Sequence, residues 1–120
     1  MKKRSVLVVE DNELNLEMLC SFIEEKFDVI KAYNGLEALN YLKTSVNDVS
    51  LILTDVNMPV MNGYEATGII RKSGSAVPIV AMTANAFDED RAKALESGMD
   101  DFISKPINTA ELVKVLEKFL

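Results

Sequence analysis

The sequence predicts one α/β domain in which parallel strands alternate with helices. Three observations lead to this prediction: short β-branched apolar runs recur along the chain, apolar stripes with helical spacing lie between them, and no linker or repeat interrupts the series. The first, third and fourth runs are continuously apolar, as expected of parallel strands that helices cover on both faces. We therefore expect residues 1–120 to form a single domain.

The expected strands follow the apolar runs in chain order, at residues 6–9, 27–32, 51–54, 79–82 and 102–103. Helices between them are indicated by apolar side chains at i, i+3, i+4 and i+7, as in Leu16, Leu19, Cys20, Ile23; Gly35, Ala38, Leu39, Leu42; and Leu112, Val115, Leu116, Phe119. Ala66, Ile69 and Ile70 form a shorter stripe. A further helix is expected from about residue 87 to 97, ended by Gly98.

Three helix starts carry the same Asn-x-x-Glu pattern, which is the spacing of a capping box. The pairs are Asn34 with Glu37, Asn62 with Glu65, and Asn108 with Glu111. Five βα units with short, right-handed connections leave few possible strand orders. We predict the flavodoxin-like order 2-1-3-4-5, a (βα)5 three-layer sandwich with a five-stranded parallel sheet.

Composition and charge exclude several classes of function. Lys and Arg number 13 against 19 Asp and Glu, and the net charge of −6 repels nucleic acid and anionic membranes, so neither is expected as a direct partner. A lone Cys20 cannot form an internal disulfide, and the chain has no secretory segment or long apolar run, so we expect a cytoplasmic protein. Without histidine, the chain has no histidine-based catalysis of its own.

Polar side chains follow the expected strands at the sheet edge where open parallel sheets bind ligands. Glu10 and Asp11 follow the first strand, Asp55 the third, Thr83 the fourth and Lys105 the fifth. Three neighbouring carboxylates need a counter-charge to stay ionised, and a set of oxygen ligands favours Mg²⁺ or a relative such as Mn²⁺. An ammonium and a hydroxyl opposite the metal suit phosphoryl oxygens, so the site is suited to a phosphoryl group on a carboxylate.

Four stretches in this order resemble the response-regulator receiver domains of two-component and phosphorelay signalling, over essentially the whole chain. They are VLVVEDN at 6–12, LILTDVNMPVMNGYEA at 51–66, PIVAMTANA at 78–86 and GMDDFISKPI at 98–107. The resemblance implies that Asp55 is the phosphoacceptor and that Glu10 and Asp11 are the acidic pair at a Mg²⁺ ion. It also implies that the backbone carbonyl of Asn57 completes the metal site.

The same resemblance implies the roles of three further residues. Thr83 and Lys105 would bind the phosphoryl oxygens and assist catalysis at Asp55, and Phe102 would be the aromatic switch residue, in place of the equally familiar Tyr. A Phe has no hydroxyl, so its buried and exposed positions differ by packing alone. The residues of the last two stretches resemble those in receivers of hybrid histidine kinases. We expect the chain to be a single-domain regulator or an excised receiver.

The function implied by the resemblance is a phosphorylation-activated signalling switch. The phosphodonor would be a histidine kinase or a histidine phosphotransfer protein, or else a small acyl phosphate, because this chain has no histidine. Phosphorylation would alter the face formed by the fourth helix, fifth strand and fifth helix, which would regulate a protein target. The chain would then be a regulatory phosphoacceptor rather than an enzyme, catalysing only its own phosphorylation and dephosphorylation.

Three alternatives fit the same residues less well. A haloacid-dehalogenase-like phosphatase would place a second Asp two residues after Asp55, where this chain has Asn57. A flavodoxin-like flavin binder would have glycine and hydroxyls after the first strand, where this chain has Glu10 and Asp11. A docking module without phosphorylation would not need the full set of acidic, Thr and Lys residues.

Overall fold

Strands and helices alternate along the chain. The computed structural model describes residues 4–44, 49–56, 61–83, 88–105 and 107–120. The strands are β1 (Ser5–Val9), β2 (Asp28–Ala32), β3 (Leu51–Asp55), β4 (Ile79–Thr83) and β5 (Asp101–Ser104). The helices are α1 (Glu13–Ile23), α2 (Gly35–Thr44), α3 (Gly63–Lys72), α4 (Asp88–Ser97) and α5 (Thr109–Phe119).

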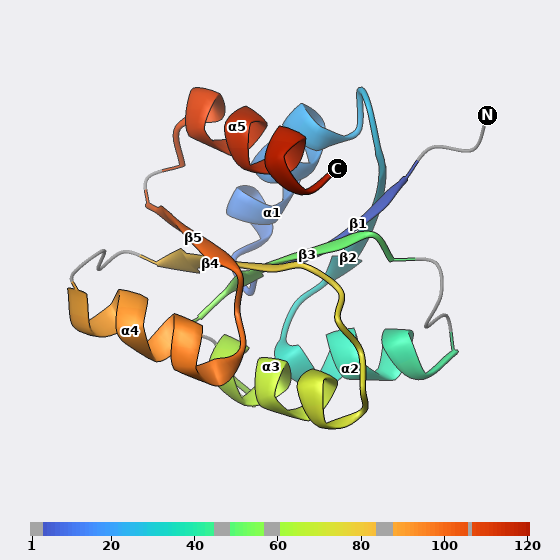
Figure 1. Cartoon of the computed structure of the whole chain (residues 1–120). Coiled ribbons are helices and arrows are strands. Elements are labelled where there is room, and N and C mark those ends of the chain that lie inside the picture. The colour runs from blue at the N-terminus through green and yellow to red at the C-terminus, as the bar shows by residue number, and fades with distance from the viewer. Residues whose placement is uncertain (1–3, 45–48, 57–60, 84–87, 106) are drawn as a thin grey trace.

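The five strands form one parallel sheet in the order β2-β1-β3-β4-β5, which confirms the predicted strand order. Helices α1 and α5 lie on one face of the sheet, and α2, α3 and α4 lie on the other (Figure 1). This is the predicted three-layer sandwich. Because all strands run the same way, their carboxyl ends share one edge of the sheet.

The core is divided by the sheet into two apolar clusters. Val6 and Val8 of β1 pack with side chains of α1 and α5, whereas Leu7 and Val9 pack with side chains of α2, α3 and α4. Both faces are therefore buried, which explains why the strand runs are continuously apolar. The alternation also decides which face each residue at the strand ends continues.

The Asn caps form as predicted, although only one is a complete capping box among the described residues. At α3, Asn62 accepts from the backbone N–H of Glu65 at 2.9 Å, and Glu65 accepts in return from the N–H of Asn62 at 3.4 Å. At α2, Asn34 accepts from the N–H of Glu37, but the Glu37 carboxylate accepts from the N–H of Tyr33 instead. The Asn34 cap therefore forms, but the Glu37 carboxylate binds the N–H of the residue before the cap instead of the N–H of the cap residue.

Some sequence-based boundaries and burial assignments were wrong. Strand β2 begins at Asp28 rather than residue 27, and β5 extends over Asp101–Ser104 rather than 102–103 alone. Ile69, assigned to an apolar stripe, is 45% exposed, because it faces outward on α3 while Ile70 enters the core. Helix α4 begins at Asp88, and residue 87 lies outside the described part.

The helices are short, with 10 or 11 residues each. At a rise of about 1.5 Å per residue they are just long enough to cover strands of four or five residues. Within the residues that the structure describes, no helix has the length and apolar character needed to cross a membrane.

Candidate functional site

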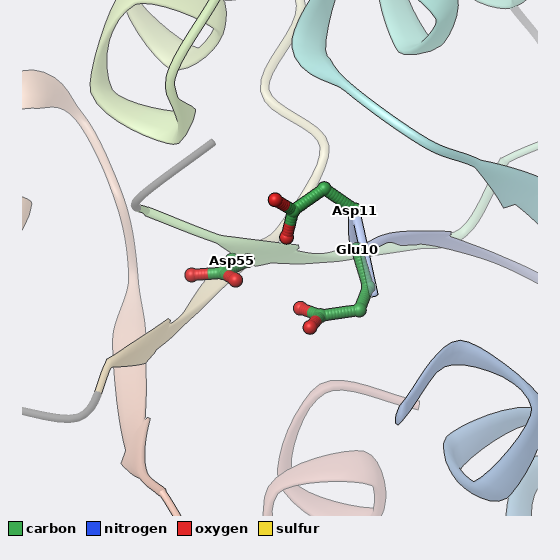
Figure 2. A group of neighbouring side chains, drawn as sticks. All are labelled: Glu10, Asp11 and Asp55. Atoms are coloured by element: carbon green, nitrogen blue, oxygen red, sulfur yellow. The ribbon is translucent and has the colours of Figure 1, made fainter. Parts of the chain in front are cut away.

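Three carboxylates meet at the carboxyl edge of the sheet. Glu10 and Asp11 follow the last residue of β1, and Asp55 is the last residue of β3, the strand next to β1. Figure 2 shows the three carboxylate groups gathered around one space between these two strand ends. One oxygen from each carboxylate lies within 4.8 Å of one from each of the others. The arrangement brings together the acidic residues expected from the sequence.

Lys105 supplies a positive charge to this cluster. Its Nζ donates to Asp55 Oδ2 at 2.9 Å and to Glu10 Oε2 at 3.3 Å, so one ammonium bridges two of the carboxylates. The backbone N–H of Lys105 donates to the carbonyl of Thr83 at 2.7 Å, which fixes the chain just after β5 against the end of β4. The side chain is thereby directed across the edge toward β3 and β1.

Burial and charge compete at Glu10 and Lys105. Burial raises the pKa of Glu10 to about 7, the hydrogen bond and negative charge of Asp55 act in the same direction, and Lys105 and Asn15 oppose them. Burial alone would lower the pKa of Lys105, but the hydrogen bond and charge of Asp55, followed by those of Glu10, outweigh it and raise the pKa. At Glu10, burial and the neighbouring Asp55 therefore outweigh the Lys105 ammonium, which favours the protonated carboxyl.

The donor set suits a hard divalent cation. The three clustered groups are all carboxylates, two of them buried and Asp11 exposed, so an entering ion would meet oxygen ligands and keep contact with water. Such ligands fit Mg²⁺ or Mn²⁺, whereas Zn²⁺ is usually held by His or Cys. Asn57, whose carbonyl was expected to complete the site, lies outside the described residues.

Thr83 and Phe102 lie on the face of the sheet that α2, α3 and α4 cover. Thr83 ends β4 and is buried, on the face to which Ile79 and Ala81 contribute. Phe102 is the β5 neighbour of Ala81 and is half-buried, and the next same-face pair is Thr83 with Ser104. Thr83 therefore lies two residues along β4 from Ala81, the residue that pairs with Phe102, so the two residues expected to form a switch are near neighbours on adjacent strands.

Sequence reasoning missed two residues that shape the site. Asn15 donates from Nδ2 to Glu10 Oε1 at 3.3 Å, from the first turn of α1. Gly63 approaches the backbone of Asp55 so closely that a Cβ there would lie 2.6 Å from the Asp55 carbonyl oxygen. Its place after the cap residue Asn62 was a usable signal, because glycine often marks a close backbone approach.

The chain belongs to the response regulator receiver domain family, whose pattern matches residues 6–117. Among curated proteins, it is 40% identical over 124 residues to hybrid signal transduction histidine kinase I of Dictyostelium discoideum. The alignment covers 97% of this chain but 7% of that protein's length, so this chain spans a small part of the relative. The family supports the receiver interpretation over the dehalogenase-like and flavin-binding alternatives.

Two solved structures have the same fold as this chain and are at least 34% identical to it in sequence. The co-crystal structure of the Saccharomyces cerevisiae histidine phosphotransfer signaling protein Ypd1 with the receiver domain of its downstream response regulator Ssk1 matches with a TM-score of 0.90 and 37% identity, covering 98% of this chain and 89% of that one. The receiver domain of sensor histidine kinase PA1611 from Pseudomonas aeruginosa, with a magnesium ion coordinated in the active site cleft, matches with a TM-score of 0.87 and 34% identity, covering 98% and 97%. This chain is accordingly a receiver domain of phosphorelay signalling.

Proposed function

We propose that the chain is a phosphorylation-activated switch and that Asp55 is its phosphoacceptor. The observation that carries the proposal is the position of the Asp55 carboxylate, which accepts from the Lys105 ammonium at 2.9 Å and lies beside Glu10 and Asp11 at the edge of the sheet. A carboxylate in this position is a nucleophile with a cationic group ready to neutralise charge on an entering phosphoryl group.

The transfer forms a bond between an Asp55 oxygen and phosphorus, while the bond from phosphorus to the donor's imidazole nitrogen breaks. The imidazole leaves with the electron pair of the broken bond. Lys105 already bridges Asp55 and Glu10, so its ammonium reaches the new phosphoryl oxygens by a small movement and balances their charge. The catalysis is positioning and charge neutralisation, which makes the chain a regulatory acceptor rather than an enzyme that acts on an external substrate.

Glu10, Asp11 and Asp55 are proposed to hold Mg²⁺ or Mn²⁺, with the carbonyl of Asn57. When bound, the ion neutralises the carboxylates and the phosphoryl oxygens. Glu10 must lose its proton to act as a ligand, and its raised pKa makes this deprotonation part of metal binding. The magnesium ion in the active site cleft of the related PA1611 receiver domain supports the same ligand chemistry here.

The phosphodonor is proposed to be a histidine kinase or a histidine phosphotransfer protein that docks on α1. Leu14, Met18 and Phe22 repeat every four residues on this helix and are 77%, 57% and 52% exposed, so they form one outward apolar stripe. The stripe starts three residues after Asp11. A partner covering it would therefore present its phosphohistidine at the acidic edge. The co-crystal structure of Ypd1 with the Ssk1 receiver domain supports a histidine phosphotransfer protein as such a partner.

The output is proposed to pass through Thr83 and Phe102 to the face formed by α4, β5 and α5. Thr83 moving toward a phosphoryl group would vacate space on its face of the sheet, and Phe102 can turn into that space because its neighbour Ala81 is small. The surface that a protein target reads would then change although it lies away from Asp55.

Intact-mass spectrometry tests the proposal. Incubation with Mg²⁺ and acetyl phosphate should add one phosphoryl mass to the wild type, none in excess EDTA and none to Asp55→Asn, whose amide is isosteric but not nucleophilic. Asp28→Asn, which alters an exposed carboxylate on β2, is the matched control and should be phosphorylated normally. A full mass increment on Asp55→Asn would overturn the assignment of the acceptor.

A further inference from the structure

Residues 91–97 of helix α4, whose side chains are described, make little apolar contact with the sheet. Among its residues whose side chains are described, Ala94 alone is buried, and Leu95 is 57% exposed. Helix α1 by comparison buries four side chains of its stripe. Because hydrophobic stabilisation grows with the apolar area removed from water, α4 is anchored less firmly than α1.

Two cations on α4 add to this limited contact, because each lies over an aromatic ring of a neighbouring element. The guanidinium carbon of Arg91 lies 4.5 Å from the centre of the Phe102 ring on β5. The ammonium of Lys93 lies 4.9 Å from the centre of the Tyr64 ring on α3. Both distances are within the roughly 6 Å range of cation–π attraction.

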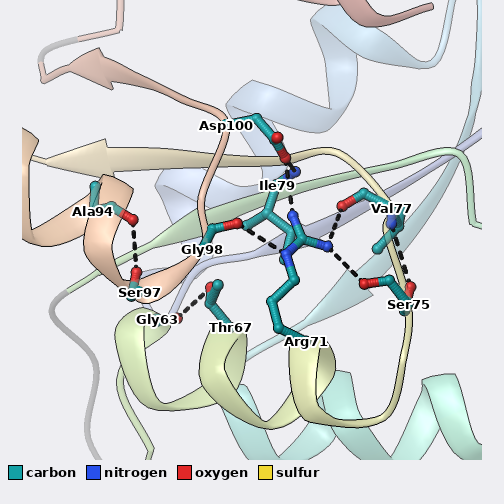
Figure 3. A network of polar contacts seen from close by, with 10 residues as sticks. All are labelled: Gly63, Thr67, Arg71, Ser75, Val77, Ile79, Ala94, Ser97, Gly98 and Asp100. Atoms are coloured by element: carbon teal, nitrogen blue, oxygen red, sulfur yellow. Dashed lines mark hydrogen bonds and ion pairs between the residues drawn. The ribbon is translucent and has the colours of Figure 1, made fainter.

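The carboxyl end of α4 is fixed much more firmly than the rest of the helix (Figure 3). Arg71 of α3 donates to the carbonyl of Gly98 and to the carboxylate of Asp100, both at 2.9 Å. Asp100 in turn accepts from the backbone N–H of Ile79 at 2.9 Å. This network ties the connection between α4 and β5 to α3 and β4.

The Phe102 ring is in contact with the Arg91 guanidinium, and we call this position of the ring outward. Phe102 and Arg91 both line a groove of about 380 Å³ between α4, β5 and α5, which opens to solvent. A ring that turned from this groove toward the space beside Ala81 and Thr83 would leave the guanidinium behind. The contact therefore favours the outward position of Phe102 over the inward one.

We infer that Arg91 is a positioning residue for Phe102, acting as a latch that the phosphorylation switch must open. The inference rests on the proposed function, and it adds a specific restraint on the switch. A partly exposed cation–π contact changes a two-state equilibrium by about two- to fivefold. Removing the cation should raise the inward population of Phe102 by that factor before any phosphoryl group is present.

The test compares Arg91→Gln with Arg91→Lys, which keeps a cation, and with Lys93→Gln, which removes the cation facing Tyr64. Arg91 is exposed, so these variants should fold. NMR three-bond couplings report the χ1 rotamer of Phe102 in the unphosphorylated, metal-free protein. We expect Arg91→Gln to shift the rotamer population inward two- to fivefold, Arg91→Lys to restore most of the wild-type value, and Lys93→Gln to leave it unchanged.

A titration with beryllofluoride, a phosphoryl mimic, at saturating Mg²⁺ then separates the latch from the switch. We expect half-saturation of Arg91→Gln at a concentration about two- to fivefold lower than for the wild type. Unchanged Phe102 couplings in Arg91→Gln, with normal beryllofluoride binding, would overturn the latch and leave the proposed function standing. A changed rotamer in a protein that binds no beryllofluoride would support the latch and contradict the proposed function.

Discussion

Replacing Glu10 by Gln should remove a pH dependence of folding that the acidic cluster creates in the metal-free protein. The pKa of Glu10 is raised from 4.5 to about 7, chiefly by burial. The native state therefore holds this proton more tightly than the unfolded chain does. Protonation of Glu10 therefore stabilises the native state fully below pH 4.5, and this stabilisation is lost as the pH rises toward about 7.

The size of the effect follows from the same pKa. At about 1.4 kcal/mol per pH unit, the difference between 4.5 and about 7 corresponds to about 3 kcal/mol. The free energy of unfolding should be measured with urea in EDTA at pH 4 and pH 8. Wild type should lose about 3 kcal/mol more between these pH values than Glu10→Gln, whose amide does not titrate.

Glu117→Gln, which alters an exposed carboxylate on α5, is the control and should follow the wild type. Saturating Mg²⁺ at pH 8 should restore stability to wild type more than to Glu10→Gln, because the ion binds the ionised carboxylate of the native state. The same pH dependence in wild type and Glu10→Gln would refute the reasoning, since it would mean that Glu10 carries no excess proton in the native state.

Three further predictions concern the residues around the acceptor. Lys105→Ala should still accept a phosphoryl group, but beryllofluoride should no longer shift the NMR signals of α4, β5 and α5, and a wild-type pattern of shifts would remove Lys105 from signalling. Thr83→Ala should bind beryllofluoride but show smaller NMR shifts on the same face, because it loses a coupling free energy of about 1–3 kcal/mol between the site and that face; equal shifts in both proteins would contradict the switch mechanism. Met18→Glu should slow transfer from a phosphorylated histidine phosphotransfer protein at least about tenfold without changing uptake from acetyl phosphate, whereas Leu95→Glu on α4 should leave both rates unchanged.

The arrangement of the sheet and the position of the acidic cluster were predictable from sequence because both depend on simple periodicities. Continuously apolar runs indicate parallel strands buried on both faces, and parallel strands bring the residues after them to one edge. Glu10 and Asp55 were therefore expected to be neighbours although they are far apart in the chain. The roles of the individual residues came from the family resemblance and stay predictions until they are tested.

Contacts that depend on three-dimensional approach were not predictable. Ile69 fitted the apolar stripe of α3 by spacing, but its neighbour Ile70 takes the buried position. The Arg91 contact with Phe102 joins a surface charge to a residue on another element, and the sequence spacing of the two carries no signal for it.

The site of phosphorylation is the central claim, and it is tested most directly by locating the acyl phosphate along the chain. The protein should be phosphorylated in Mg²⁺ by a phosphohistidine donor and then reduced with borohydride, which converts an aspartyl phosphate to homoserine. Peptide sequencing by mass spectrometry should find homoserine at position 55 alone. Homoserine at position 11, or a reduced glutamyl phosphate at Glu10, with an intact Asp55, would contradict the account.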